Sequence, residues 1–263
     1  MGKIIAICNQ KGGVGKTTTA INLSSSLVEK GKTVLLIDID PQGNSTKGVG
    51  IDKDIISKSI YDVLLLKENA ADVILNTQFG IDLIPATIDL AMADFDLATS
   101  DEKKHYHLKN QLDSIKANYD FIIIDCPPSL GLLNMNALVA SDSVIVPVQC
   151  EYYALDGLIS LLTTIRKIQS GLNKELNIEG VLITMYDSRT KLHNEVSMDI
   201  RKFFKESVYE ISIPRSIKFP TSQSKGKPIL YYDRMSNATK SYLELADEVI
   251  NNKNGNKRKI RSK

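Results

Sequence analysis

Phosphate binding is the first chemistry that this sequence suggests. Residues 11–19 read Lys-Gly-Gly-Val-Gly-Lys-Thr-Thr-Thr, between an apolar run at residues 3–8 and an amphipathic stretch at 16–30. A glycine-rich turn between a strand and a helix presents backbone N–H groups and the positive end of the helix dipole to phosphate oxygens. The pattern therefore predicts a nucleotide phosphate site, with contacts from Lys11, Gly12, Gly13, Val14, Gly15, Lys16, Thr17 and Thr18.

Three polar side chains of this loop have separate expected tasks. Lys16 can reach the β- and γ-phosphates, the Thr17 hydroxyl can hold Mg²⁺, and the Thr18 hydroxyl can bond the α-phosphate. The loop departs from the plain G-x-x-x-x-G-K-[ST] pattern, because Gln10 stands at the first glycine position and a second lysine, Lys11, follows it. A lysine there lies close to the phosphates but need not point at those of its own chain.

Carboxylates end two further apolar runs. Residues 35–40 read Leu-Leu-Ile-Asp-Ile-Asp, and residues 121–125 read Phe-Ile-Ile-Ile-Asp. The carboxyl ends of strands in a doubly wound sheet line the ligand crevice, so we expect Asp38 and Asp40 to face the phosphates. There a carboxylate can orient water for attack on the γ-phosphate or organise the water around Mg²⁺, although Asp38 could instead cap the following turn. Asp125 ends a Walker B-like strand and is expected to bind Mg²⁺ through water.

The elements that must position these residues alternate along the chain. Nearly continuous apolar runs are typical of strands that helices cover on both faces, so the pattern predicts a doubly wound α/β fold with a mostly parallel sheet. We expect one domain over residues 1–252, with exposed loops at 41–58 and 214–236. The expected strands are residues 3–8, 33–38, 81–85, 121–125, 143–148 and 178–184. The expected helices are residues 16–30, 59–66, 108–118, 130–140, 155–170, 195–206 and 239–252.

Composition limits the class of protein. Of 263 residues, 43% are hydrophobic and 24% charged, which excludes a disordered or collagen-like chain. Three cysteines without a C-x-x-C pair, Cys8, Cys126 and Cys150, argue against a disulfide framework and a cysteine zinc site. No apolar stretch approaches the roughly 18 residues of a membrane span, so we expect a cytoplasmic protein. Residues 253–263 hold six basic residues and no acid, and we expect a disordered tail or an arm for nucleic acid or acidic lipid.

The phosphate loop, Lys-Gly-Gly-Val-Gly-Lys-Thr-Thr, resembles the deviant Walker A loop of the ParA/MinD ATPases. The segment Asp-Ile-Asp-Pro-Gln-Gly-Asn resembles the second motif of that family. The likeness covers nearly the whole chain and is strongest to the small ParA/Soj-type partition ATPases, with no room for the N-terminal helix-turn-helix domain of larger ParA proteins. It implies ATP and Mg²⁺ as cofactors and weak basal ATP hydrolysis, with Asp40 orienting water. It also implies a homodimer in which Lys11 reaches the partner's nucleotide, and it places Met185 and Pro214 near the adenine.

Two C-terminal segments resemble the parts of Soj-type proteins that bind DNA non-specifically. They are residues 184–190, Thr-Met-Tyr-Asp-Ser-Arg-Thr, and 213–218, Ile-Pro-Arg-Ser-Ile-Lys. The resemblance assigns DNA contacts to Arg189 and Lys218, which suits binding by phosphate neutralisation and counterion release. Lys191, Lys225, Lys227 and Lys240 could extend the patch or be solvated surface charges. The family likeness further implies a ParB-like centromere-binding partner that stimulates hydrolysis, and a location on the nucleoid.

Four other functions fit the same fold. A MinD-like membrane-cycling ATPase needs an amphipathic C-terminal helix, whereas the basic tail offers only Ile260 as an apolar residue. A redox enzyme of the nitrogenase reductase type needs cysteine cluster ligands, which the spacing of Cys126 and Cys150 does not supply. A biosynthetic ligase of the dethiobiotin synthetase type would not need the basic segments at 189–191 and 215–227. A structural DNA coat with an inactive site is disfavoured because the residues for phosphate chemistry are all present.

Overall fold

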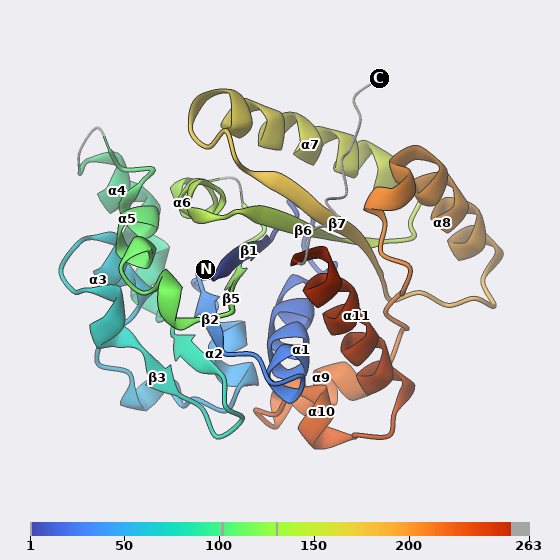
Figure 1. The fold of residues 1–263 in the computed structure, drawn as a ribbon, viewed down its shortest axis with the longest axis horizontal. Coiled ribbons are helices and arrows are strands. Elements are labelled where there is room, and N and C mark those ends of the chain that lie inside the picture. Colours follow the sequence, from blue (N-terminus) through green and yellow to red (C-terminus); the bar gives the residue numbers. More distant parts are fainter. Residues whose placement is uncertain (1, 101–102, 130, 254–263) are drawn as a thin grey trace.

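A seven-stranded sheet forms the centre of the computed structural model, which describes residues 2–100, 103–129 and 131–253 (Figure 1). The strand order is β3-β4-β2-β5-β1-β6-β7, and each neighbouring pair is parallel except β3 with β4. The predicted doubly wound α/β fold is therefore confirmed. The strands are β1 (Lys3–Ile7), β2 (Val34–Asp38), β3 (Leu75–Asn76), β4 (Asp82–Ile84), β5 (Phe121–Asp125), β6 (Ser143–Gln149) and β7 (Asn177–Thr184).

The three central strands end at the same level. β5 pairs with both β1 and β2, which sets Asp125 beside Ile7 and beside Asp38. Every residue of β2 and β5 is buried, as expected for strands covered on both faces. The phosphate loop, the acidic turn at 38–40 and Asp125 therefore meet at one edge of the sheet.

Helices cover both faces of the sheet. Helices α1, α9, α10 and α11 pack on the face that includes Ile5 and Ile7, whereas α3 to α8 pack on the face that includes Ile4 and Ala6. Figure 1 shows α1 and α11 side by side, with α9 and α10 at one end of the pair. The helices are α1 (Lys16–Glu29), α2 (Asn44–Gly48), α3 (Ile60–Leu64), α4 (Ala93–Ala98), α5 (His107–Asp113), α6 (Leu132–Ala140), α7 (Ala154–Gly171), α8 (Lys191–Phe204), α9 (Lys218–Ser224), α10 (Ile229–Tyr232) and α11 (Asn237–Lys253).

The two segments predicted as exposed loops are partly helical and partly buried. Residues 41–58 contain α2, where Thr46 is fully buried, and residues 214–236 contain α9 and α10, where Ser222 is fully buried. The prediction was wrong because buried hydrogen bonds satisfy these hydroxyls: Thr46 donates to Asp38, and Ser222 donates to a carbonyl of its own helix. Both segments contact α1, through α2 and α10.

The remaining expected elements are present, with shifted ends. The edge strand β3 has only two residues, and no sequence pattern predicted it. Short 3₁₀ turns occur at Lys53–Ile55, Ala70–Val73, Ile88–Met92, Lys116–Asn118 and Lys205–Ser207. Helix α11 ends at Lys253, and the rest of the predicted basic tail, residues 254–263, lies outside the described residues. Within the described ranges, no helix combines the length and apolarity that crossing a membrane requires.

Candidate nucleotide site

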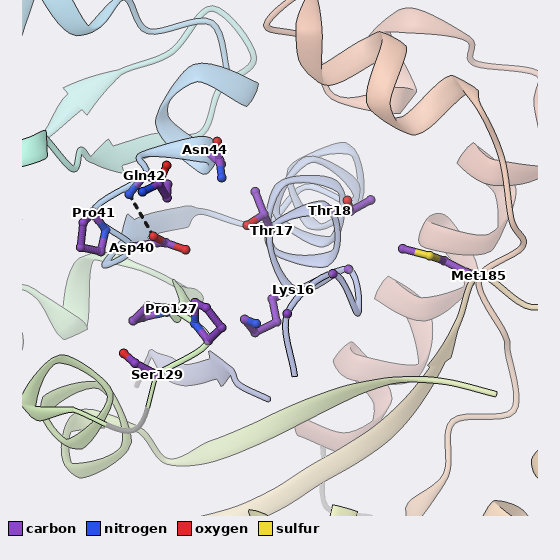
Figure 2. A pocket seen from close by; sticks show the side chains of 14 residues that line it. Lys16, Thr17, Thr18, Asp40, Pro41, Gln42, Asn44, Pro127, Ser129 and Met185 are labelled. Carbon is purple, nitrogen blue, oxygen red and sulfur yellow. Dashed lines mark hydrogen bonds between the residues drawn. The ribbon is translucent and has the colours of Figure 1, made fainter. Parts of the chain in front are cut away.

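A pocket of about 550 Å³ lies where the carboxyl ends of β1, β2 and β5 meet (Figure 2). It brings together the phosphate loop, the turn after β2 and the loop after β5, three segments far apart in the sequence. Met185, just past β7, closes one side. The lining residues are Gly12, Gly13, Gly15, Lys16, Thr17, Thr18, Asp40, Pro41, Gln42, Asn44, Pro127, Pro128, Ser129 and Met185.

The phosphate loop is held by side chains from neighbouring strands. Gly13 and Gly15 have left-handed φ angles of 75° and 89°, which only glycine adopts without strain. The Gln149 amide donates to the Gly13 carbonyl at 3.0 Å. The Thr184 hydroxyl donates to the carbonyl of Val14, a buried residue, at 2.8 Å. These bonds engage two of the loop's carbonyl groups and hold the loop at the start of α1, where N–H groups and the helix dipole favour an anion.

The two lysines of the loop point in different directions. Lys16 is buried, lines the pocket (Figure 2) and donates to the Lys11 carbonyl at 3.2 Å. The ammonium of Lys11 instead pairs with the Glu151 carboxylate outside the pocket, where both side chains are half exposed. Lys11 is not among the described residues that line the pocket. This placement suits a lysine that acts on a nucleotide other than that of its own chain.

Asp125 is fully buried, and a hydrogen bond is found for one of its two carboxylate oxygens. Its Oδ2 accepts the Ser45 hydroxyl at 2.7 Å, while its Oδ1 has no hydrogen-bond partner among the described residues. Burial is the main reason that the pKa of Asp125 rises to about 8; the nearby Asp38 raises it further, and the Ser45 and Thr17 hydroxyls oppose the rise. An orphaned oxygen on a carboxylate whose charge is destabilised fits a divalent cation bound between Asp125 and Thr17.

The two carboxylates of the acidic turn have different surroundings. Asp38 accepts the Thr46 N–H and hydroxyl, each at 2.8 Å, and burial raises its pKa to about 6. Asp38 is not among the described residues that line the pocket, because α2 folds back and engages its carboxylate. Its expected role in the water shell of Mg²⁺ stays a prediction. Asp40 does line the pocket, and one of its oxygens accepts the Gln42 N–H at 2.9 Å (Figure 2).

The two residues expected near the adenine lie on adjoining segments, and one of them is among the described residues that line the pocket. Met185 lines the pocket with a left-handed φ of 52° and receives a contact from the Gln149 amide. Pro214 lies beside Tyr186 in a parallel bridge and is not among the described lining residues. The geometry thus brings Met185, and not Pro214, to the pocket.

The two principal residues expected to bind DNA lie on adjoining segments. The Tyr186 N–H donates to the Ile213 carbonyl and the Arg215 N–H donates to the Tyr186 carbonyl, which joins the loop before α8 to the loop before α9. Arg189, 88% exposed, forms a bidentate pair with Asp187, and this pair lowers the pKa of Asp187.

The remaining cations expected to bind DNA also have neighbours or face solvent. Lys218 pairs with Asp233, and Lys191 pairs weakly with Glu195 at 3.7 Å. The Lys225 ammonium lies 5.3 Å from the centre of the Tyr232 ring. Exposed pairs of this kind contribute little to stability, so a DNA phosphate can replace the carboxylate. Two further lysines of the expected patch, Lys227 and Lys240, are exposed.

Sequence reasoning missed several residues that shape this site. Ser45 bonds Asp125, Gln149 fixes the phosphate loop and Glu151 holds Lys11. A fourth, Gln223 of α9, donates to the Thr18 hydroxyl at 3.0 Å. None of these contacts is local in sequence, and serine, glutamine and glutamate in polar stretches carry no spacing signal that could have identified them.

Known proteins with similar sequences and structures were compared with the chain. Residues 2–178 match a family model described as an AAA domain. The chain is 53% identical over 253 residues to the sporulation initiation inhibitor protein Soj of Bacillus subtilis (strain 168), covering 96% of this chain and 100% of that protein. It is 47% identical over 251 residues to the chromosome partitioning protein ParA of Myxococcus xanthus, covering 95% and 88%.

A solved structure from Mycobacterium smegmatis, described as cobyrinic acid a,c-diamide synthase with a bound ATP analog and magnesium, has the same fold. Its TM-score is 0.86 at 35% identity, with 100% of both chains covered. That protein therefore holds a nucleotide and Mg²⁺ on this fold.

Proposed function

The chain belongs to the Soj/ParA family of chromosome partitioning ATPases, and we propose that it is an ATP-dependent dimerising switch that drives chromosome or plasmid partition. Residues 1–252 act as one ATPase domain. The ATP-bound dimer binds DNA without sequence preference on the nucleoid, and hydrolysis releases it. The observation that carries the proposal is a phosphate pocket on the same chain as exposed Arg189 and Lys218 on adjoining segments.

ATP and Mg²⁺ fit the residues of the pocket. Residues 12–18 would hold the phosphates through backbone N–H groups and Lys16, and Met185 would lie against the base. Thr17 and Asp125 would hold the metal, which fits the unpartnered Asp125 oxygen. Bound Mg²⁺ supplies positive charge to the β- and γ-phosphates. Asp38, beside Asp125 in the sheet, would act on the metal only through water, because Thr46 already engages its carboxylate.

Asp40 is the residue proposed to orient the attacking water. One carboxylate oxygen is fixed by the Gln42 N–H, so the carboxylate has a set direction at the pocket wall, and it can accept a hydrogen bond from water. Lys16 stabilises the charge that develops on the γ-phosphate. Weak basal hydrolysis follows, because the free chain keeps Lys11 on Glu151 and lacks a second cation at the γ-phosphate.

Dimerisation completes the site in this proposal. Lys11 leaves Glu151 and reaches the nucleotide of the partner, so each chain supplies a cation to the other. An exposed pair between half-exposed side chains costs little to break, which makes this exchange feasible. A ParB-like partner is proposed to accelerate hydrolysis and thereby to convert it into movement of the cargo.

A second candidate is an ATP-dependent biosynthetic enzyme, because the Mycobacterium smegmatis structure described above is named for a diamide synthase. The higher identity to Soj and ParA and the exposed cations on the 184–190 and 213–218 segments favour partition. A small-molecule enzyme gains nothing from solvent-facing cations outside the pocket.

Charge reversal at Arg189 tests the proposed DNA surface. Arg189→Glu should keep ATP-driven dimerisation and lose most non-specific DNA affinity, because the exposed cation becomes an anion. Lys109→Glu, on the exposed side of α5, changes the net charge equally and serves as the matched control. Unchanged DNA binding by Arg189→Glu at matched salt would place the DNA surface elsewhere.

A further inference from the structure

Helix α9 is joined to the nucleotide pocket by one side chain. Gln223 donates from its amide nitrogen to the Thr18 hydroxyl oxygen at 3.0 Å, across 205 positions of sequence. Thr18 itself lines the pocket, and Gln223 is half buried between α9 and α1. The same helix begins at Lys218, one of the cations proposed to meet DNA. This contact therefore connects the two surfaces that the proposed function requires.

Other contacts hold the same segment against the nucleotide-binding elements. The Asn22 side chain of α1 donates to the Thr18 carbonyl at 2.8 Å and accepts the Ile229 N–H at 2.7 Å, which ties the start of α10 to α1. The turn after α9 packs backbone to backbone on the turn after α2: a Cβ at Gly226 would lie 2.9 Å from the Gly50 Cα. Helix α9 thus rests on both the phosphate-loop helix and the segment that follows Asp40.

A hydroxyl group has one proton to donate and lone pairs that accept. Since the Thr18 oxygen accepts from Gln223, its own proton does not point at that partner and is available to an oxygen in the pocket. We propose that Gln223 is a positioning residue, which turns the Thr18 hydroxyl toward the nucleotide's phosphates and couples phosphate binding to the position of α9. The inference rests on the proposed function, because it requires a nucleotide in the pocket and DNA at α9.

The contact between Gln223 and Thr18 is expected to act on the affinity for nucleotide. Thr18 is expected at the α-phosphate, which ADP and ATP share, so Gln223 should strengthen binding of both nucleotides alike. Loss of one hydrogen bond of this kind weakens binding about three- to tenfold.

The test uses Gln223→Met, which keeps the length of the side chain and removes the donor. Its dissociation constant for Mg²⁺-ADP should rise about three- to tenfold. Thr221→Ala, an exposed position on the same helix, is the matched control and should bind ADP as the unaltered chain does. Unchanged ADP affinity in Gln223→Met would overturn the proposal.

A double-mutant cycle separates this role from a general effect on the fold. In a chain that already carries Thr18→Val, adding Gln223→Met should not weaken ADP binding further, because Gln223 acts through the hydroxyl that is already missing. An additive loss in the double variant would contradict the positioning role, and it would do so even if Gln223→Met lowered the melting temperature.

Binding of DNA tests the proposed coupling between the nucleotide pocket and α9. Reciprocity requires that, if ATP promotes DNA binding, a non-specific duplex tightens binding of a non-hydrolysable ATP analogue by the same factor. That factor should fall in Gln223→Met and stay constant in Thr221→Ala; an unaltered factor would remove the link to α9. If the unaltered chain binds no duplex at all, the proposed function fails, while the ADP measurements still decide the role of Gln223 at the phosphates.

Discussion

Replacing Asp125 by asparagine should stabilise the nucleotide-free protein at alkaline pH and abolish its response to Mg²⁺. The native carboxyl is fully buried, and its pKa rises from 3.8 to about 8. A pKa that is raised in the folded state contributes stability below pH 3.8, and this contribution is lost as the pH rises through 8. The unaltered chain should therefore lose stability across that interval, and Asp125→Asn should lose less.

The size of the effect follows from the same shift. Each pKa unit corresponds to about 1.4 kcal/mol, so a rise of this extent costs the ionised form several kcal/mol. Because Asp38 lies beside Asp125 and shares the burial, we expect about 3 kcal/mol of extra unfolding free energy for Asp125→Asn at pH 8, and little at pH 4.

Urea unfolding of the nucleotide-free chain in a metal chelator, at pH 5, 6.5 and 8, measures this difference. Asp113→Asn, which removes an exposed carboxylate on α5, is the control for the loss of one negative charge. Added Mg²⁺ and ADP should then stabilise the unaltered chain and not Asp125→Asn. An offset between the two chains that does not grow with pH, or a variant still stabilised by Mg²⁺-ADP, would refute a carboxylate held ready for a cation.

Three further changes have expected outcomes. Gly226→Ala should destabilise the fold by about 2–4 kcal/mol in urea, because its φ is 61° and a Cβ would strike Gly50, whereas Gly157→Ala, with open space around it, should not. Asp187→Asn should raise affinity for non-specific duplex DNA about two- to fivefold, because it removes the counter-ion of Arg189; unchanged affinity at matched salt would argue against Arg189 at the DNA. Asp40→Ala should slow ATP hydrolysis by roughly 100-fold or more, so that an ATP-bound dimer accumulates and is detected by gel filtration. Normal turnover would show that Asp40 does not orient the attacking water.

The fold could be predicted from the sequence because local apolar patterns indicate its main strands. The apolar run at residues 121–125 coincides with β5, and the glycine-rich segment after β1 has the left-handed angles that its glycines predicted. Parallel strands ending at one edge then explain why Lys16 and Asp40 line one pocket and why Asp125, at the end of β5, lies at the same edge of the sheet. Local pattern and sheet topology agree at these positions.

Contacts between distant polar residues could not be predicted. Asp38 and Asp40 look equivalent in the sequence, yet α2 returns to engage Asp38 through Thr46, and the pocket keeps Asp40. The 214–236 segment reads as an exposed loop because its serines and lysines are polar, while its position depends on partners in α1 and α2. Such contacts depend on tertiary packing, which determines where a short polar helix lies.

The central claim is tested most directly by binding of the full chain to a non-specific DNA duplex with ATP, with ADP and without nucleotide, each across a salt series. We expect tight binding only with ATP, falling steeply as salt rises, because exposed arginine and lysine neutralise phosphates without reading bases. Equal binding in all three states, or none in any, would contradict an ATP-operated partition switch.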